Sequence, residues 1–237
     1  RSSAPNITAV APLIAGHGTG VSVLYSHFSD LIHLQSGHME RLVELEDLTI
    51  SRLVVGPLQN NVYVIDSSGE AVIVDAADEA DRILESVVDV NVTAILTTHG
   101  HQDHVGAARQ VRDSLRVPFR LHPADSQIAG IEPDDPLEHD QIITLGTSSI
   151  HVLHTPGHTP GTVCFLIENQ LFSGDTLFPG GPGATRFAYS DFDQIMASLD
   201  HQLFILDDAT MVYPGHGAST TIGSERPHIE EWRTRRW

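Results

Sequence analysis

The chain has 237 residues, with 31 Asp and Glu against 13 Lys and Arg and a formal net charge of -18, a length that fits one large α/β or sandwich domain. The acidic balance disfavours contact with nucleic-acid phosphates, no apolar run approaches the ~20 residues of a membrane-spanning helix, and a lone cysteine, Cys164, excludes an intramolecular disulfide framework. We therefore expect a soluble, cytoplasmic protein with neither a nucleic-acid nor a membrane partner.

The first 38 residues differ from the rest of the chain. They contain only two charged side chains, Arg1 and Asp30, and show no helical or strand period. Gly37-His38-Met39 resembles a cloning scar followed by an initiator methionine. We expect residues 1–38 to be a leader, either vector-derived or flexible, and residues 39–237 to form the folded domain.

From residue 39 onward, short β-branched runs alternate with helical patterns. The runs predict strands at 61–66, 71–75, 93–98, 141–145, 150–154, 162–167, 171–173 and 211–213. Apolar residues at helical spacing predict helices at 79–88, 105–115 and 191–206, the last with Ser190 as its N-cap, and a polar helix from Ser224. Strands predominate and helices occur in both halves, which favours two sheets packed face to face with helices outside.

The segment His99-Gly-His101-Gln-Asp103-His104 places three imidazoles and one carboxylate in six positions. Buried together as a core they would need partners for every ring nitrogen, which makes a packing role untenable. Neutral imidazole nitrogens and carboxylate oxygens are the ligands that zinc prefers. His99 and His101 can reach one ion from an extended backbone, whereas Asp103 and His104 turn into the next helix and point elsewhere. One loop can therefore serve two neighbouring metal ions.

Three further candidate ligands follow predicted strands, and each comes directly after a glycine that permits a tight turn: His158, Asp175 and His216. The remaining histidines that we considered are interpreted as structural, namely His122, His139, His151, His201 and His228. His154 shares a segment with His158, and we interpret it as a strand-end residue or a support for that ligand.

These motifs resemble those of the metallo-β-lactamase-fold hydrolase superfamily, and within it the single-domain glyoxalase II-like branch, from about Ile50 to Gly223. The resemblance implies an α/β fold for the hydrolase domain, an αββα four-layer sandwich with a binuclear site along one edge of its two sheets. It also implies two divalent ions, zinc foremost and iron or manganese otherwise, with these ligands: His99, His101 and His158 on one ion, Asp103, His104 and His216 on the other, and Asp175 bridging them.

The same resemblance implies positions around the ligands. Asp175 distinguishes the chain from lactamases that place a cysteine there. Asn61 and Asp75 match the family's early hairpin, where such an aspartate supports the ligand loop. Two interpretations of Arg186 stay open: it contacts an anionic substrate, or it anchors its own loop.

The implied function is a metal-dependent hydrolase that attacks a carbonyl with a metal-bridging hydroxide, which Asp103 ligates and orients. Its partner would be a small-molecule thioester of the hydroxyacylglutathione type, or a related ester or lactone. Two alternatives stay open at this point: a mononuclear-iron persulfide dioxygenase that uses a subset of the same ligands, and a non-catalytic metal-binding module.

Overall fold

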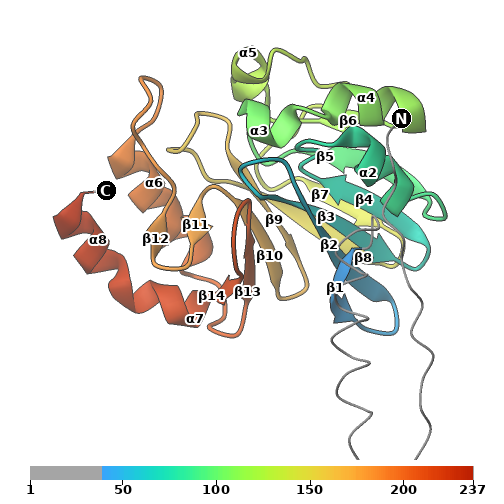
Figure 1. The fold of residues 1–237 in the computed structure, drawn as a ribbon. Helices are drawn as coiled ribbons and strands as arrows, with labels where there is room; N and C mark the ends of the chain where they lie inside the picture. The colour runs from blue at the N-terminus through green and yellow to red at the C-terminus, as the bar shows by residue number, and fades with distance from the viewer. Residues whose placement is uncertain (1–38, 237) are drawn as a thin grey trace, which may run out of the picture. The chain divides into compact units, whose positions relative to one another are not determined.

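The computed structural model describes residues 39–236 (Figure 1). The predicted leader, residues 1–38, lies outside this range. Within the described range, no helix has both the length and the apolar character needed to cross a bilayer.

The first sheet has the strand order β1-β2-β3-β4-β5-β6. Strands β1 to β4 pair antiparallel along the chain, whereas β4, β5 and β6 pair parallel, so that helical crossovers connect the last three. The strands of this sheet are β1 (Glu40–Glu44), β2 (Leu48–Val55), β3 (Asn60–Ser67), β4 (Glu70–Val74), β5 (Val92–Leu96) and β6 (Phe119–Arg120).

The second sheet has the order β14-β13-β10-β9-β8-β7. Only β10 and β13 pair parallel in it, and the other neighbours are antiparallel. Its strands are β7 (Ile142–Leu145), β8 (Ser148–His154), β9 (Val163–Ile167), β10 (Gln170–Gly174), β13 (Met211–Pro214) and β14 (Thr220–Thr221). A separate two-stranded ribbon consists of β11 (Leu177–Phe178) and β12 (Gly181–Pro182).

Helices cover the outer faces of the two sheets (Figure 1). Those that follow strands of the first sheet are α2 (Ala80–Ser86), α3 (Gln102–Val105), α4 (Ala108–Leu115), the 3-10 turn η1 (Pro123–Asp125) and α5 (Ser126–Ala129). Those of the second half are α6 (Phe192–Ser198), the π-helix η2 (Leu199–Leu203), α7 (Ile222–Glu225), the 3-10 turn η3 (Arg226–His228) and α8 (Ile229–Arg235).

Three hydrophobic clusters separate these four layers. The alternation along β3 sends Val62 and Val64 toward α2 and α4, and Tyr63 and Ile65 into the cluster between the sheets. A third cluster packs the second sheet against α6 and α8, where Trp232 is fully enclosed. The predicted αββα four-layer sandwich is thereby confirmed.

The element boundaries correct three expectations. We predicted neither β1 nor β2. In β2, polar and charged residues such as Arg52 interrupt the alternation of apolar residues that would have indicated a strand. The helix predicted at 105–115 is two helices, α3 and α4, with α3 beginning at Gln102. The N-cap of α6 is Asp191, whose side chain accepts the Gln194 N–H, and Ser190 instead donates its hydroxyl to the His158 carbonyl.

Candidate metal centre

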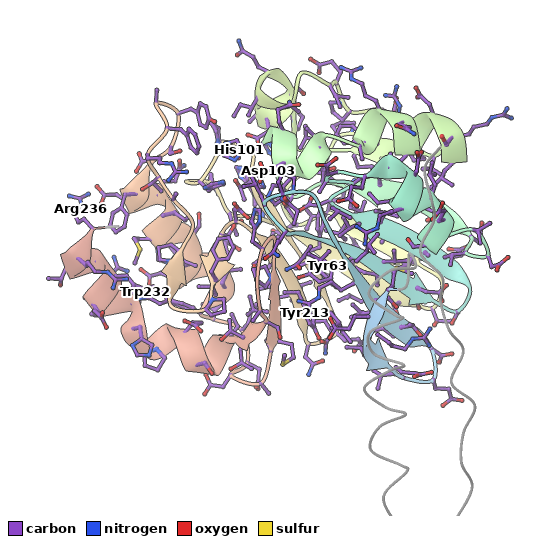
Figure 2. The ribbon with its side chains drawn as sticks, viewed as in Figure 1. Tyr63, His101, Asp103, Tyr213, Trp232 and Arg236 are labelled. Carbon is purple, nitrogen blue, oxygen red and sulfur yellow. The ribbon has the colours of Figure 1, made fainter. Side chains whose placement is uncertain are left out.

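All seven predicted ligands lie along one edge of the two sheets, at the ends of strands. The loop from His99 to His104 follows β5 of the first sheet. The other three follow strands of the second sheet: His158 lies in the turn after β8, Asp175 directly follows β10, and His216 follows β13. Figure 2 shows His101 and Asp103 beside each other near α3. The site is therefore built across the seam between the two halves of the sandwich.

Three imidazoles form the first cluster. The Nδ1 atom of His101 lies 3.0 Å from Nε2 of His99 and 3.0 Å from Nε2 of His158, and the three nitrogens lie within 4.8 Å of one another. Burial and the neighbouring imidazoles lower the pKa of His99, and they lower the pKa of His101 to about 4. At neutral pH these rings are therefore uncharged, which is the form that binds a metal ion.

A carboxylate and two imidazoles form the second cluster. The Oδ2 atom of Asp103 lies 3.3 Å from Nε2 of His216 and 3.7 Å from Nε2 of His104, and the three ligand atoms again lie within 4.8 Å. Burial raises the pKa of Asp103, but the hydrogen bond from His216 and the charge of His104 outweigh it, so the net shift is downward. Asp103 is therefore a carboxylate at neutral pH.

Asp175 lies between the two clusters. Its Oδ2 atom is 3.6 Å from Nε2 of His158 in the first cluster, and its Oδ1 atom is 3.5 Å from Nε2 of His104 in the second. Each oxygen thus faces a different cluster, so the carboxylate can bridge the two.

Two atoms at this point are buried and have no hydrogen-bond partner among the described residues: Nε2 of His104 and Oδ1 of Asp175. Buried polar atoms in proteins almost always have a partner. Because the two atoms lie 3.5 Å apart within clusters of nitrogen and carboxylate donors, a divalent cation would satisfy both. The residues present therefore fit a pair of metal ions.

Asp75 supports the ligand loop, as the resemblance implied. Its Oδ1 accepts the Thr98 N–H at 2.7 Å, and its Oδ2 accepts the Thr98 hydroxyl and contacts Nδ1 of His104, both at 2.8 Å. The contact uses the outer nitrogen of His104 and leaves Nε2 facing the cluster, which fixes the ring's orientation. Asn61 supports the opposite loop, since its side-chain amide donates to the carbonyls of Pro214 and Gly217.

Three residues around the ligands were missed at the level of sequence. The Asn60 side chain donates to Oδ2 of Asp103 at 3.1 Å, Tyr189 lies with its hydroxyl 2.8 Å from Nε2 of His101, and Asp125 contacts the ligand loops. Tyr189 belongs to no recognisable motif. Asn60 is the first residue of strand β3, and Asp125 lies in the 3-10 turn η1. Only their positions in space distinguish them.

The other histidines lie outside the clusters. His154 ends β8, and its Nε2 lies 2.9 Å from the Pro160 carbonyl. Its ring stacks on His122 with centroids 4.3 Å apart. His154 therefore braces the turn that carries His158 and faces no potential metal position.

A cavity of about 560 Å³ opens onto the clusters. Five of the seven predicted ligands line it, together with Leu58, Arg186 and Phe187. The Arg186 guanidinium lies 5.6 Å from the centroid of the Phe187 ring, and Leu58 is largely exposed. The cavity thus combines one cationic side chain with apolar surface.

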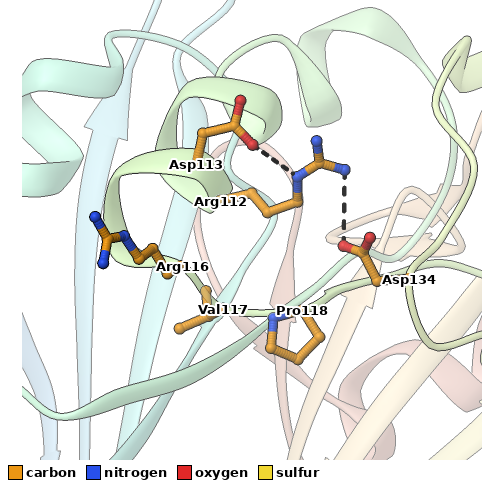
Figure 3. A pocket seen from close by; sticks show the side chains of 6 residues that line it. All are labelled: Arg112, Asp113, Arg116, Val117, Pro118 and Asp134. Atoms are coloured by element: carbon orange, nitrogen blue, oxygen red, sulfur yellow. Dashed lines mark hydrogen bonds and ion pairs between the residues drawn. The ribbon is translucent and has the colours of Figure 1, made fainter.

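A second cavity, of about 450 Å³, lies at the end of α4 (Figure 3). Arg112 pairs there with Asp113 and with Asp134. Its lining holds no imidazole or thiol, and its charges neutralise one another. We assign no function to this cavity.

The αββα sandwich and the His/Asp clusters at its sheet edge together define a class of metal-binding enzyme folds. Residues 55–216 match the family model described as the metallo-beta-lactamase superfamily. The chain belongs to this superfamily, so the resemblance inferred from its motifs is confirmed.

Individual relatives cover the same part of the chain. The chain is 33% identical to a protein named hydroxyacylglutathione hydrolase GloC from Haemophilus influenzae, over 76% of this chain and 95% of that one. A structure titled BLEG-1 B3 metallo-beta-lactamase is 35% identical, with a TM-score of 0.68 over 76% of this chain and 97% of the other. The protein TTHA1623, solved in a di-iron-bound form, is 35% identical, with a TM-score of 0.65 over 74% and 96% of the two chains.

Proposed function

We propose that the protein is a binuclear metal-dependent hydrolase of small thioesters, or of related esters and lactones. The observation that carries the proposal is the two neighbouring clusters, one of three imidazoles and one of a carboxylate with two imidazoles, with Asp175 between them. In this assignment His99, His101 and His158 bind one ion, Asp103, His104 and His216 bind the other, and Asp175 bridges them.

A pair of divalent ions held by these residues would supply hydroxide at neutral pH and would stabilise the negative charge that develops on a carbonyl oxygen. The chain's own residues prepare for that chemistry. Asp103 stays ionised and is oriented by the Asn60 amide, so its carboxylate can ligate and direct the nucleophile. The outer nitrogen of each ligand imidazole is occupied by a protein atom, which keeps the inner nitrogens aimed at the cluster.

The cavity and the relatives support a small anionic substrate. Arg186 lines the cavity and can bind a substrate carboxylate, while Leu58 and Phe187 offer apolar contact. The relative named hydroxyacylglutathione hydrolase makes a glutathione thioester the first substrate to test. The net charge of -18 disfavours polyanions such as RNA.

Zinc is the proposed metal, because nitrogen and carboxylate ligands suit it. The di-iron form of a relative keeps iron as the second choice. Metal analysis of the purified protein, joined to a screen of thioesters, lactones, β-lactams and phosphodiesters, tests the proposal. We expect close to two ions per chain, turnover of thioesters or lactones, and negligible nuclease activity at physiological salt.

Asp175→Asn should weaken metal retention and reduce turnover by orders of magnitude, because it replaces one carboxylate oxygen with an NH2 group and removes the negative charge. His151→Ala is the matched control, since His151 is exposed on β8 and lies outside the clusters. Equal effects from the two substitutions would refute the ligand assignment. A stoichiometry of one ion per chain after saturation with metal, together with sulfite formed from a glutathione persulfide, would favour the persulfide dioxygenase over the hydrolase.

A further inference from the structure

The carboxylate of Asp125 is completely buried between the two loops that carry the first cluster. Its Oδ2 atom accepts the Gly100 N–H at 2.7 Å and the Thr159 hydroxyl at 2.6 Å. Its Oδ1 atom accepts the Gly161 N–H at 2.7 Å. One side chain therefore joins the loop after β5, in the first sheet, to the turn after β8, in the second.

These contacts lie next to all three imidazoles of the first cluster. Gly100 is the residue between His99 and His101, and Thr159 directly follows His158. The loop is also packed closely on Asp125, because a Cβ atom at Gly100 would lie 2.7 Å from the Asp125 carbonyl oxygen and 3.1 Å from its Cβ. A shift of the Asp125 carboxylate would therefore move the three ligands relative to one another.

The second cluster depends on other supports. Asn60 contacts Asp103 and His216, and Asp75 contacts His104. Within residues 39–236, Asp125 hydrogen-bonds no ligand of either cluster directly, but its partners Gly100 and Thr159 directly adjoin ligands of the first cluster and none of the second. Asp75 also reaches the first cluster, because the Thr98 hydroxyl that it accepts lies 3.1 Å from Nδ1 of His99.

We propose that Asp125 is a positioning residue for one metal position only, the one formed by His99, His101 and His158, whereas Asp75 supports both positions. The inference rests on the proposed binuclear site and adds to it a division between the two positions. Its consequence is that loss of Asp125 weakens metal binding at the first position while the second keeps its affinity.

The test separates the positions by removing one ligand from each. In the full chain, His216→Ala leaves the first position and His158→Ala leaves the second. Zn²⁺ affinity is measured for both by competition with a chromophoric chelator, with and without Asp125→Asn. We expect Asp125→Asn to weaken the ion in the His216→Ala protein by about 10- to 100-fold, the usual effect of losing a partner that orients ligands. In the His158→Ala protein it should change the dissociation constant by less than about twofold.

Asp75→Asn is the reference for an unselective effect, and it should weaken zinc binding in both backgrounds. The inference is overturned if Asp125→Asn weakens both backgrounds equally, or neither. Should Asp125→Asn fail to fold, as judged by circular dichroism, Thr159→Val removes one of its three donors and should give the same selectivity with a smaller change. A wild-type chain that binds two ions but hydrolyses no substrate would refute the proposed function without contradicting this inference.

Discussion

Each imidazole of the candidate metal centre contacts the protein through one ring nitrogen and turns the other toward the cluster. The partners of the outer nitrogens are of different kinds: a carboxylate, two backbone carbonyls and two hydroxyls. The pairs are His99 with Thr98, His101 with Tyr189, His104 with Asp75, His158 with Ala184, and His216 with Leu58. Such partners set which nitrogen carries the proton, so the ligand geometry is largely established before a metal ion binds.

Tyr189 is 40% exposed, and removal of its hydroxyl gives a direct test of these partners. Tyr189→Phe leaves Nε2 of His101 without its protein contact, although water can partly replace it. We expect zinc affinity to fall by up to about 10-fold with little change in stability. Tyr213→Phe is the matched control, because that hydroxyl donates to Gln170 in the sheet interior. Equal zinc affinities in the two variants would show that the Tyr189 contact does not orient His101.

The protonation of His104 predicts how metal uptake depends on pH. Burial lowers its pKa, but the nearby carboxylates of Asp175, Asp75 and Asp103 outweigh burial and raise it to about 9. In the metal-free protein His104 is therefore protonated at pH 7 and must lose that proton to bind an ion. Burial lowers the pKa of His216, the other imidazole of this position, but Asp103 and Asp175 outweigh burial and raise it. Affinity for the second position should therefore rise at least about 10-fold per pH unit from pH 7 and level off above about pH 9.

Chelator competition over that pH range, in the His158→Ala protein, provides the measurement. The His216→Ala protein is the comparison, because the lowered pKa values of His99 and His101 leave the first cluster neutral throughout. A flat profile in the His158→Ala protein would contradict the prediction.

At the scale of elements, the turn between β8 and β9 carries His158 and is set by its contact with α6. Gly157 has φ +137, and a Cβ atom there would lie 2.3 Å from the Ile195 backbone nitrogen. No side chain fits at this position without displacing the helix or the turn. The position of His158 is therefore determined by helix packing as well as by its own strand.

Gly157→Ala should accordingly destabilise the fold and weaken zinc binding together. The overlap costs about 1–3 kcal/mol, in addition to about 1–2 kcal/mol for the backbone conformation. Gly69→Ala is the control, because Gly69 also has a positive φ, at +85, but has no atom within 4 Å of the added Cβ. Urea unfolding and zinc titration of both variants measure the difference. Unchanged zinc affinity in Gly157→Ala would show that the turn tolerates the displacement.

The seven side chains that the structure brings together could be picked out from the sequence because their signal is local. His99 to His104 lie in six consecutive positions, and each remaining ligand follows a strand and a glycine. The supports are recognisable only in space. Asp125 lies in a 3-10 turn that carries no recognisable motif. Its role depends on Gly100 and Gly161, which belong to loops of the two different sheets. The edge strand β1 was missed for a related reason, since its partly exposed residues lack a clear alternation.

At the scale of the whole molecule, the two sheets contribute ligands from opposite sides of the seam. The first sheet supplies the loop after β5, and the second sheet supplies the turns after β8, β10 and β13. A hydrophobic cluster fills the space between the sheets, and the predicted ligands lie at its edge. Each proposed ion would thus be bound by both halves of the molecule.

This shared seam has a consequence for the order of folding events. Because the ligands are far apart along the chain, neither metal position exists until the sheets have docked, and contacts of such long range form slowly. A bound ion would therefore stabilise the folded state and not the transition state, which leaves the folding rate unchanged and slows unfolding. Stopped-flow traces with and without Zn²⁺ should differ only in the unfolding limb. Faster refolding in zinc would mean that the site assembles before the halves meet.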